Sequence, residues 1–257
     1  MDVKKRRGPW KTPNVTADGL KIFAIIIMLI QNIGIIVIEK GIIRLDGYTT
    51  QSQLSDAMAK DSKLMTLAGA GSVMQLIGGL AVPIFAFLLV EGFLKTSSYS
   101  RYLISMVIFA VISEIPYDIA TSNNVVEQSG QNALVTMCIC LLMLYFLRMF
   151  KERNGIMYAV VRLIIVLCAI VWVTLFKAQF GLCMVLLTAI FYLFYSKNAL
   201  KTFLGMLASL LYVTGPLSFY GIWCYTEERK DILPKYVYYA FYPLHLLVLW
   251  AIVKIFM

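Results

Sequence analysis

The run LKIFAIIIMLIQNIGIIVI, residues 20–38, decides what kind of fold this chain adopts. Apart from Lys21 and the amide pair Gln31 and Asn32, its 19 residues carry no strongly polar side chain. About 20 such residues are enough for an α-helix to cross the hydrocarbon core of a bilayer. The run is too long for the apolar part of a secretory signal peptide and lacks a small-residue cleavage site. We therefore expect a membrane-spanning helix here.

The composition of the whole chain agrees with this run. Of its 257 residues, 60% are hydrophobic and only 14% are charged, and the mean hydropathy is +0.79. A soluble domain of this size carries about a quarter of its residues as charges. The net charge of +9 sits in short clusters between apolar runs, which is typical of loops at a membrane surface and not of a nucleic-acid-binding face. We predict membrane lipid as the surrounding partner and no nucleic acid.

Seven further apolar runs follow, so the predicted fold class is all-α, a polytopic bundle of about eight transmembrane helices. A basic tail of residues 1–19 precedes the membrane domain, residues 20–257. Within the long polar connection 39–72, the stretch Gln53–Leu67 is expected to form a short amphipathic helix at the membrane surface. The predicted later spans are Val73–Leu94, Tyr102–Ala120, Ala133–Phe150, Ile156–Phe176, Phe180–Tyr195, Leu200–Phe219 (with a possible break at Gly215-Pro216) and Tyr236–Phe256.

The loops on the side of the amino terminus hold more Lys and Arg than the loops on the other side. Cytoplasmic loops carry such an excess, so the amino terminus is expected in the cytoplasm. An even number of spans then returns the carboxyl terminus to the cytoplasm as well. The five cysteines all lie in or beside apolar segments without zinc-type spacing, so we interpret them as small apolar side chains and expect no metal.

Few ionisable side chains lie inside the predicted spans, where they are costly unless they are paired or functional. Glu91 lies near the cytoplasmic end of its span, and either pairs with Lys95 or Arg101 or belongs to a site. Glu114 and Asp118 are four residues apart and so share one helix face. They belong either to a site or to a hydrated helix end.

His245, the single histidine, lies near the middle of the last predicted span. Hydrocarbon offers no hydrogen-bond partner, so the imidazole needs a polar neighbour from another helix. It is either an interhelical hydrogen-bonding group or a catalytic base. Gln31 and Asn32 lie deep in the first span, where amides commonly join helices. Unlike an Asp-His pair, they cannot take up and release protons near neutral pH.

Several strings, taken together and in this order, resemble the TraX family. They are LKIFAIIIMLIQNIG (20–34), QLIGGLAVPIFAFLLVEGF (75–93), SRYLISMVIFAVISEIPYD (100–118), the pair Asn132 and Thr136, and YVYYAFYPLHLLVL (236–249). The resemblance covers nearly the whole chain. It implies a multi-pass protein of the bacterial plasma (inner) membrane that is linked to pilin acetylation in conjugation. It also implies a relationship to membrane acyltransferases that use cytoplasmic acyl-CoA.

The chain departs from the family pattern where relatives carry ionisable groups. In the first span, the Asp-His pair expected to supply a general base and its orienting carboxylate reads QN at 31–32. Two family arginines read Gly79 and Ser105, and an Asp-Tyr-Gly string reads QFG at 179–181. Each change removes a group suited to hold a CoA phosphate, orient a base or stabilise an oxyanion.

Two functions implied by the resemblance stay open. In the first, the chain transfers an acetyl or similar acyl group from acyl-CoA to a peptide, glycan or lipid, with His245 as base oriented by Glu91 or Glu114. The remaining residues expected at the substrate site are Gln31, Asn32, Asp118, Asn132 and Tyr242. In the second, the chain is a catalytically degenerate relative that acts as an immunity, regulatory or assembly factor. A transporter is disfavoured because no internal repeat is evident.

Overall fold

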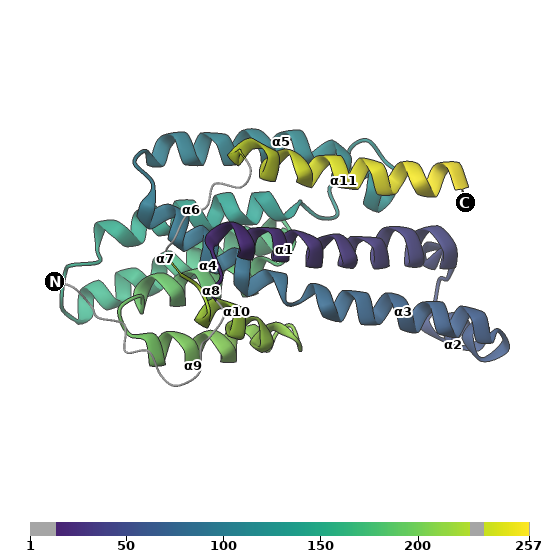
Figure 1. Ribbon diagram of the computed structural model, residues 1–257, viewed down its shortest axis with the longest axis horizontal. Coiled ribbons are helices and arrows are strands. Elements are labelled where there is room, and N and C mark those ends of the chain that lie inside the picture. Colours follow the sequence, from purple (N-terminus) through teal and green to yellow (C-terminus); the bar gives the residue numbers. More distant parts are fainter. Residues whose placement is uncertain (1–13, 227–233, 257) are drawn as a thin grey trace.

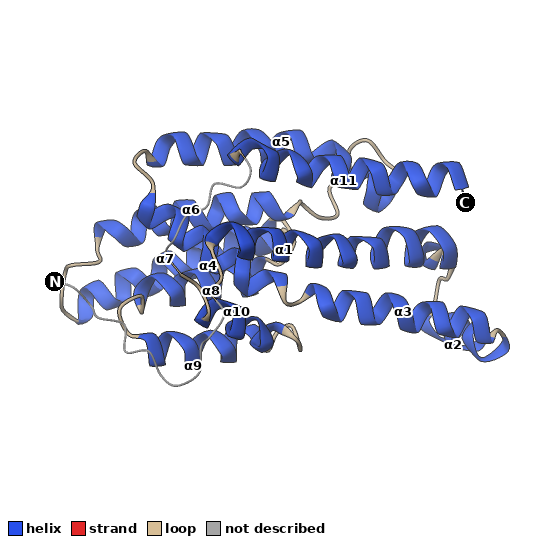
Figure 2. Cartoon of the chain, in the orientation of Figure 1, coloured by secondary structure: helices blue, strands red, loops and turns tan. Residues whose placement is uncertain are grey.

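The computed structural model describes residues 14–226 and 234–256, and within these residues the chain forms helices and loops but no β-strand (Figure 1, Figure 2). The predicted all-α class is confirmed. Residues 1–13 of the predicted tail lie outside the described residues. The elements are α1 (Ala17–Asn32), the π-helix η1 (Ile33–Ile43), the 3-10 turn η2 (Leu45–Gly47), α2 (Gln51–Lys60), α3 (Ser62–Gly78), α4 (Ala81–Lys95), α5 (Tyr99–Ser122), α6 (Ala133–Met149), α7 (Ile156–Leu175), α8 (Gly181–Leu193), α9 (Asn198–Ser209), the 3-10 turn η3 (Gly215–Ser218), α10 (Phe219–Trp223) and α11 (Lys235–Phe256).

Helices long enough to cross a membrane make up most of the described chain. Five stretches combine sufficient length with an apolar composition: Ala17–Ile43, Ser62–Lys95, Tyr99–Ser122, Ile156–Leu175 and Tyr236–Phe256. Two shorter apolar helices, α6 and α8, pack among them. The structure thus supports a helical membrane protein.

Helices α1 and α11 run in the same direction through the bundle. Tyr238 near the start of α11 donates to Asp18 in the first turn of α1 at 3.5 Å, and His245 meets Asn32 farther along both helices. We call the end at which α1 begins the amino-terminal face and the other end the opposite face. The end of α11 lies at the opposite face (Figure 1). The described chain therefore does not start and end on one side, contrary to the prediction.

The predicted span Leu200–Phe219 is wrong. Because this crossing is missing, the described chain ends at the face opposite to the predicted one. After α9 the chain turns back through η3 and α10, and Trp223 Nε1 donates to Thr202 Oγ1 at 3.2 Å, which places the two arms of this hairpin side by side. Helix α9 ends at Ser209, residues 210–214 form the turn, and Gly215-Pro216 begin η3 on the returning arm, where a Cβ on Gly215 would lie 2.4 Å from the Ser209 carbonyl oxygen. Proline lacks the N–H that a continuing helix needs. The hairpin returns to the face from which it came.

The polar connection also differs from its prediction. In place of one helix over Gln53–Leu67, α2 ends at Lys60, and the Asp61 side chain accepts from the N–H groups of Lys63 and Leu64. Asp61 thereby caps a new helix, α3, because an aspartate at this position satisfies otherwise unpaired N–H groups. Helix α3 continues almost directly into α4, which makes the 34-residue stretch Ser62–Lys95.

The core of the bundle surrounds α4, on which Ile84 and Ala86 are fully buried. By contrast, α7 buries few of its side chains and exposes Leu163, Ile164 and Trp172. An exposed apolar face of this size suits contact with lipid tails. Polar contacts that position functional side chains are therefore expected around α1, α5, α6 and α11, on the inner side of the bundle.

Candidate functional site

A hydrogen bond joins Asn32 on α1 to His245 on α11 inside the bundle. Asn32 Nδ2 lies 2.7 Å from His245 Nε2, and His245 Nδ1 lies 2.9 Å from the Phe241 carbonyl oxygen. A carbonyl oxygen only accepts, so Nδ1 carries the proton and Nε2 accepts from the amide. Both ring nitrogens are therefore engaged, and the expectation that Glu91 or Glu114 orients His245 is wrong. The Phe241 carbonyl orients the ring.

Asn132 caps the amino terminus of α6 within the bundle interior. Its Oδ1 accepts from the N–H groups of Leu134 at 2.9 Å and Val135 at 3.4 Å. Its Nδ2 donates to the Ala110 carbonyl oxygen at 2.9 Å and to the Glu114 carboxylate, both on α5. Because Ala110 lies in the middle of α5, α6 begins at that depth rather than at the bundle surface.

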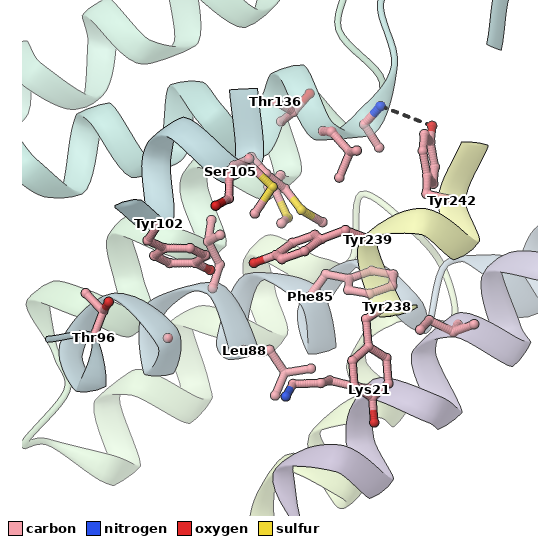
Figure 3. Close-up of a pocket in the computed structure, with 18 of the residues that line it drawn as sticks. Lys21, Phe85, Leu88, Thr96, Tyr102, Ser105, Thr136, Tyr238, Tyr239 and Tyr242 are labelled. Atoms are coloured by element: carbon pink, nitrogen blue, oxygen red, sulfur yellow. Dashed lines mark hydrogen bonds between the residues drawn. The ribbon is translucent and has the colours of Figure 1, made fainter. Parts of the chain in front are cut away.

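Tyr242 links α11 to the same region. Its hydroxyl accepts from the Ala133 N–H at 3.3 Å, drawn as the dashed line in Figure 3, and donates to Gln179 Oε1 at 3.4 Å. Gln179 lies in the loop before α8, where its backbone carbonyl accepts from Thr136 Oγ1 at 2.7 Å. These contacts form one group of side chains, called here the polar layer: Asn32, Glu114, Asn132, Thr136, Gln179, Tyr242 and His245.

A cavity of about 480 Å³, called here the first cavity, extends from the amino-terminal face to the polar layer. Its walls are mostly apolar and aromatic, with Tyr102 from α5 and Tyr239 from α11 on facing sides (Figure 3). Its inner end is formed by Thr136, Gln179 and Tyr242. The cavity thus combines an apolar passage with hydrogen-bonding groups at its end.

Three basic residues, Lys21, Lys95 and Arg101, line the first cavity near the amino-terminal face. Lys21 Nζ lies 3.0 Å from Asp18, and Lys95 Nζ lies 2.6 Å from Glu91. The two carboxylates offset part of the positive charge. The group keeps a net positive charge of one, which suits an anionic part of a ligand.

A second cavity, of about 380 Å³, lies toward the opposite face. Lys40, Lys177 and Glu127 line it, together with hydroxyl groups from the end of α5 and the loop that follows. It also reaches the polar layer, at Asn32 and Gln179. Gln179 therefore lines both cavities.

Glu91 belongs to the amino-terminal face and not to the polar layer. Glu91 pairs with Lys95, which is one of its two expected partners. It also accepts from the hydroxyls of Tyr195 at 2.8 Å and Tyr225 at 3.2 Å. Burial raises the pKa of Tyr225 above its ordinary value. Glu91 consequently holds the loop after α10 against α4, beside the first cavity.

Gln31 and Asp118 have structural contacts outside the polar layer. Gln31 packs so closely on α3 that a Cβ on Gly78 would lie 2.5 Å from its side chain. Asp118 is 2% exposed, and its Oδ2 accepts from the Glu127 N–H at 2.9 Å, which fastens the α5–α6 loop. Hydrogen bonds from Asn124 and Ser129 lower the pKa of the Glu127 carboxyl, so this residue of the second cavity is negatively charged.

Two members of the site, Thr136 and Gln179, have no functional signal in the sequence beyond their positions in the strings compared with the family, yet both form the inner end of the first cavity. Sequence cannot identify Tyr102 and Tyr239 as cavity residues, because tyrosines in apolar runs are common and the facing positions of these two depend on how α5 packs on α11.

A comparison with models of known protein families identifies one that covers nearly the whole chain. The family model described as TraX protein matches residues 16–253, which include every member of the polar layer and every residue that lines the two cavities. No curated protein and no solved structure matches the chain.

Proposed function

We propose that this chain, which belongs to the TraX protein family, transfers an acyl group from an acyl-CoA to an acceptor bound at the polar layer. The observation that carries the proposal is the first cavity, with basic residues near the amino-terminal face, apolar walls and a polar inner end. Acyl-CoA has the matching order of parts: an anionic nucleotide, a narrow pantetheine arm and an uncharged acyl thioester.

The basic residues would hold the nucleotide. Arg101 is the main candidate because Lys21 and Lys95 already pair with carboxylates, and a guanidinium binds phosphate oxygens through two parallel hydrogen bonds. The acyl arm would then pass Tyr102 and Tyr239 and reach Tyr242. In this arrangement the amino-terminal face lies on the cytoplasmic side of a bacterial plasma membrane. Acyl-CoA is present on that side, and loops on that side are rich in basic residues.

The polar layer would supply the groups that the transfer needs. The acceptor oxygen or nitrogen bonds to the acyl carbon, the carbon–sulfur bond breaks, and the proton lost by the acceptor ends on the CoA sulfur. The Tyr242 hydroxyl accepts from the Ala133 N–H and donates to Gln179 Oε1, and its proton would turn from Gln179 toward the thioester oxygen and stabilise developing negative charge there. His245 Nε2 accepts the acceptor's proton when the Asn32 amide turns aside.

Binding of acetyl-CoA to the purified protein in nanodiscs tests the donor site. We expect wild type to bind, and Arg101→Glu to weaken the affinity about tenfold, because a charge-assisted contact becomes repulsive. Arg153→Glu is the matched control, since Arg153 lies in the α6–α7 loop and does not line the cavity. Absence of acetyl-CoA binding by wild type, or an equal loss in both variants, would contradict the proposal.

A second function is favoured by one observation. Both ring nitrogens of His245 are engaged, and the residue that meets Nε2 is an amide that cannot carry a proton away. A non-catalytic role, in which the bundle binds a peptide or another membrane protein as an immunity, regulatory or assembly factor, fits this arrangement. In that case the protein would release no free thiol from acetyl-CoA, and His245→Gln would leave its partner binding unchanged.

A further inference from the structure

We propose that the second cavity is the acceptor's site, so that donor and acceptor reach the polar layer from opposite faces of the membrane. This inference rests on the proposed acyl transfer. It adds the face from which the acceptor enters and the chemical class of the acceptor. The acceptor class is a neutral or anionic molecule rich in hydroxyl groups, such as a saccharide.

The partition between the cavities is about one helical turn thick along two helices. On α1, Met28 lines the first cavity and Asn32 lines the second. On α11, Tyr242 lines the first and Leu246 lines the second. Residues four apart are separated by about 6 Å along a helix axis. In the loop before α8 the partition narrows further, because the single residue Gln179 lines both cavities.

The α5 side of the partition is thicker and is closed by polar side chains. Met106 lines the first cavity and Tyr117 lines the second, with three turns of helix between them. Glu114 lies in this interval and accepts from Asn132 Nδ2. Its Oε1 is buried and has no hydrogen-bond partner among the described residues. The route between the cavities therefore runs past Gln179 and Tyr242 rather than along α5.

The residues that line the second cavity define what it can bind. Its hydrogen-bonding groups are mainly hydroxyls and amides, from Tyr117, Thr121, Ser122, Ser129, Asn32 and Gln179. Such groups match the alternating donors and acceptors of a saccharide. The charged residues are two lysines, Lys40 and Lys177, and one carboxylate, Glu127. This balance repels a polycation and tolerates a neutral or anionic acceptor.

The transfer then joins the two sites without a carrier on the protein. A hydroxyl oxygen of the acceptor, entering beside Asn32, bonds to the acyl carbon presented beside Tyr242. The bond from that carbon to the CoA sulfur breaks, and the hydroxyl proton ends on the sulfur as a free thiol. The acylated product leaves through the second cavity, and CoA leaves through the first.

Cysteine accessibility tests the two-sided arrangement. Gln179→Cys is expected to react with a small membrane-impermeant methanethiosulfonate applied to either face, in intact cells and in inverted vesicles. Ser105→Cys, which lines only the first cavity, should react from the amino-terminal face alone, and Ser129→Cys, which lines only the second, from the opposite face alone. The unsubstituted protein corrects for the five native cysteines.

Two results would overturn the arrangement: labelling of Gln179→Cys from one face only, or labelling of the two serine positions from the same face. Neither result concerns acetyl-CoA affinity, so the donor site can stand while this inference fails.

The acceptor class is tested by thermal unfolding of the protein in nanodiscs with chitotriose or trilysine added. Chitotriose should raise the melting temperature of wild type by a few degrees and leave that of Ser129→Trp, in which an indole fills the second cavity, unchanged. Ser105→Trp, with the first cavity filled, should keep the shift. Stabilisation by trilysine, or by neither compound, would overturn the saccharide class.

Discussion

Asn32 and His245 are the residues on which the chemistry of the bundle interior depends. The first span carries no acid–base pair, yet the imidazole of α11 lies against its amide at 2.7 Å. The sequence indicated that His245 needs a polar partner, but the choice of Asn32 depends on the parallel packing of α1 and α11. The pattern of single residues cannot reveal that packing, so the contact had to come from the structure.

A double-mutant cycle measures this contact. Asn32→Ala and His245→Ala should each lower the free energy of unfolding by about 1–3 kcal/mol, because each leaves a buried polar group without its partner. The coupling energy between them should be about 1 kcal/mol, as for other hydrogen bonds between membrane helices. Titration with a denaturing detergent provides the measurement. Thr202→Ala, at the distant α9–α10 hairpin, serves as the control partner for Asn32, and equal coupling to Thr202 would refute the contact.

The α9–α10 hairpin is the element that hydropathy could not predict. Its two arms are apolar, so together they resemble one span, and only the turn at residues 210–214, just before Gly215-Pro216, distinguishes a return from a crossing. The dipeptide Gly215-Pro216 did indicate a break in this run. Whether the chain then turns back depends on contacts of the hairpin tip with α3, such as the Thr214 hydroxyl on the Leu76 carbonyl.

A glycine pair on one helical stretch tests how the hairpin is seated. A Cβ on Gly79, just after α3, would lie 2.8 Å from Thr214 Oγ1 and 2.9 Å from Tyr212 Cβ, whereas a Cβ on Gly69 meets nothing within 4 Å. Gly79→Ala should lower the free energy of unfolding by about 1–3 kcal/mol through overpacking. Gly69→Ala should be neutral or raise it by up to about 1 kcal/mol, since alanine favours a helix interior. The melting temperatures of the two variants check this, and a stabilised Gly79→Ala would show that the tip is not in contact.

For the whole molecule, the sequence predicts the fold class correctly but not the topology. Composition and run length predicted a helical membrane protein, because both depend only on what lipid demands of a chain. The face at which a helix ends depends on how many crossings precede it. Interpreting the α9–α10 hairpin as one crossing therefore reverses the face predicted for the end of α11. Each cavity is lined by residues from at least four helical elements, some of them far apart in the sequence, and no local pattern marks them.

The end of α11 lies at the face opposite to the start of α1, and this predicts the side of the carboxyl terminus. With the amino-terminal face in the cytoplasm, alkaline phosphatase fused to the carboxyl terminus should be active and green fluorescent protein fused there should be dark. The same reporters inserted in the α6–α7 loop, at the amino-terminal face, should give the reverse pattern. A fluorescent carboxyl-terminal fusion would restore the topology with both termini inside.

Photo-crosslinking can show whether an acyl thioester reaches the polar layer through the first cavity. An acyl-CoA with a diazirine in its acyl chain would be irradiated with the protein in nanodiscs, and the labelled peptides mapped by mass spectrometry. We expect labels on the stretches of α5 and α6 that line the inner half of the cavity, around Ser105, Met106 and Met137, and the loss of these labels with excess CoA. Labels confined to the lipid-facing side of α7, or labels that excess CoA leaves unchanged, would contradict it.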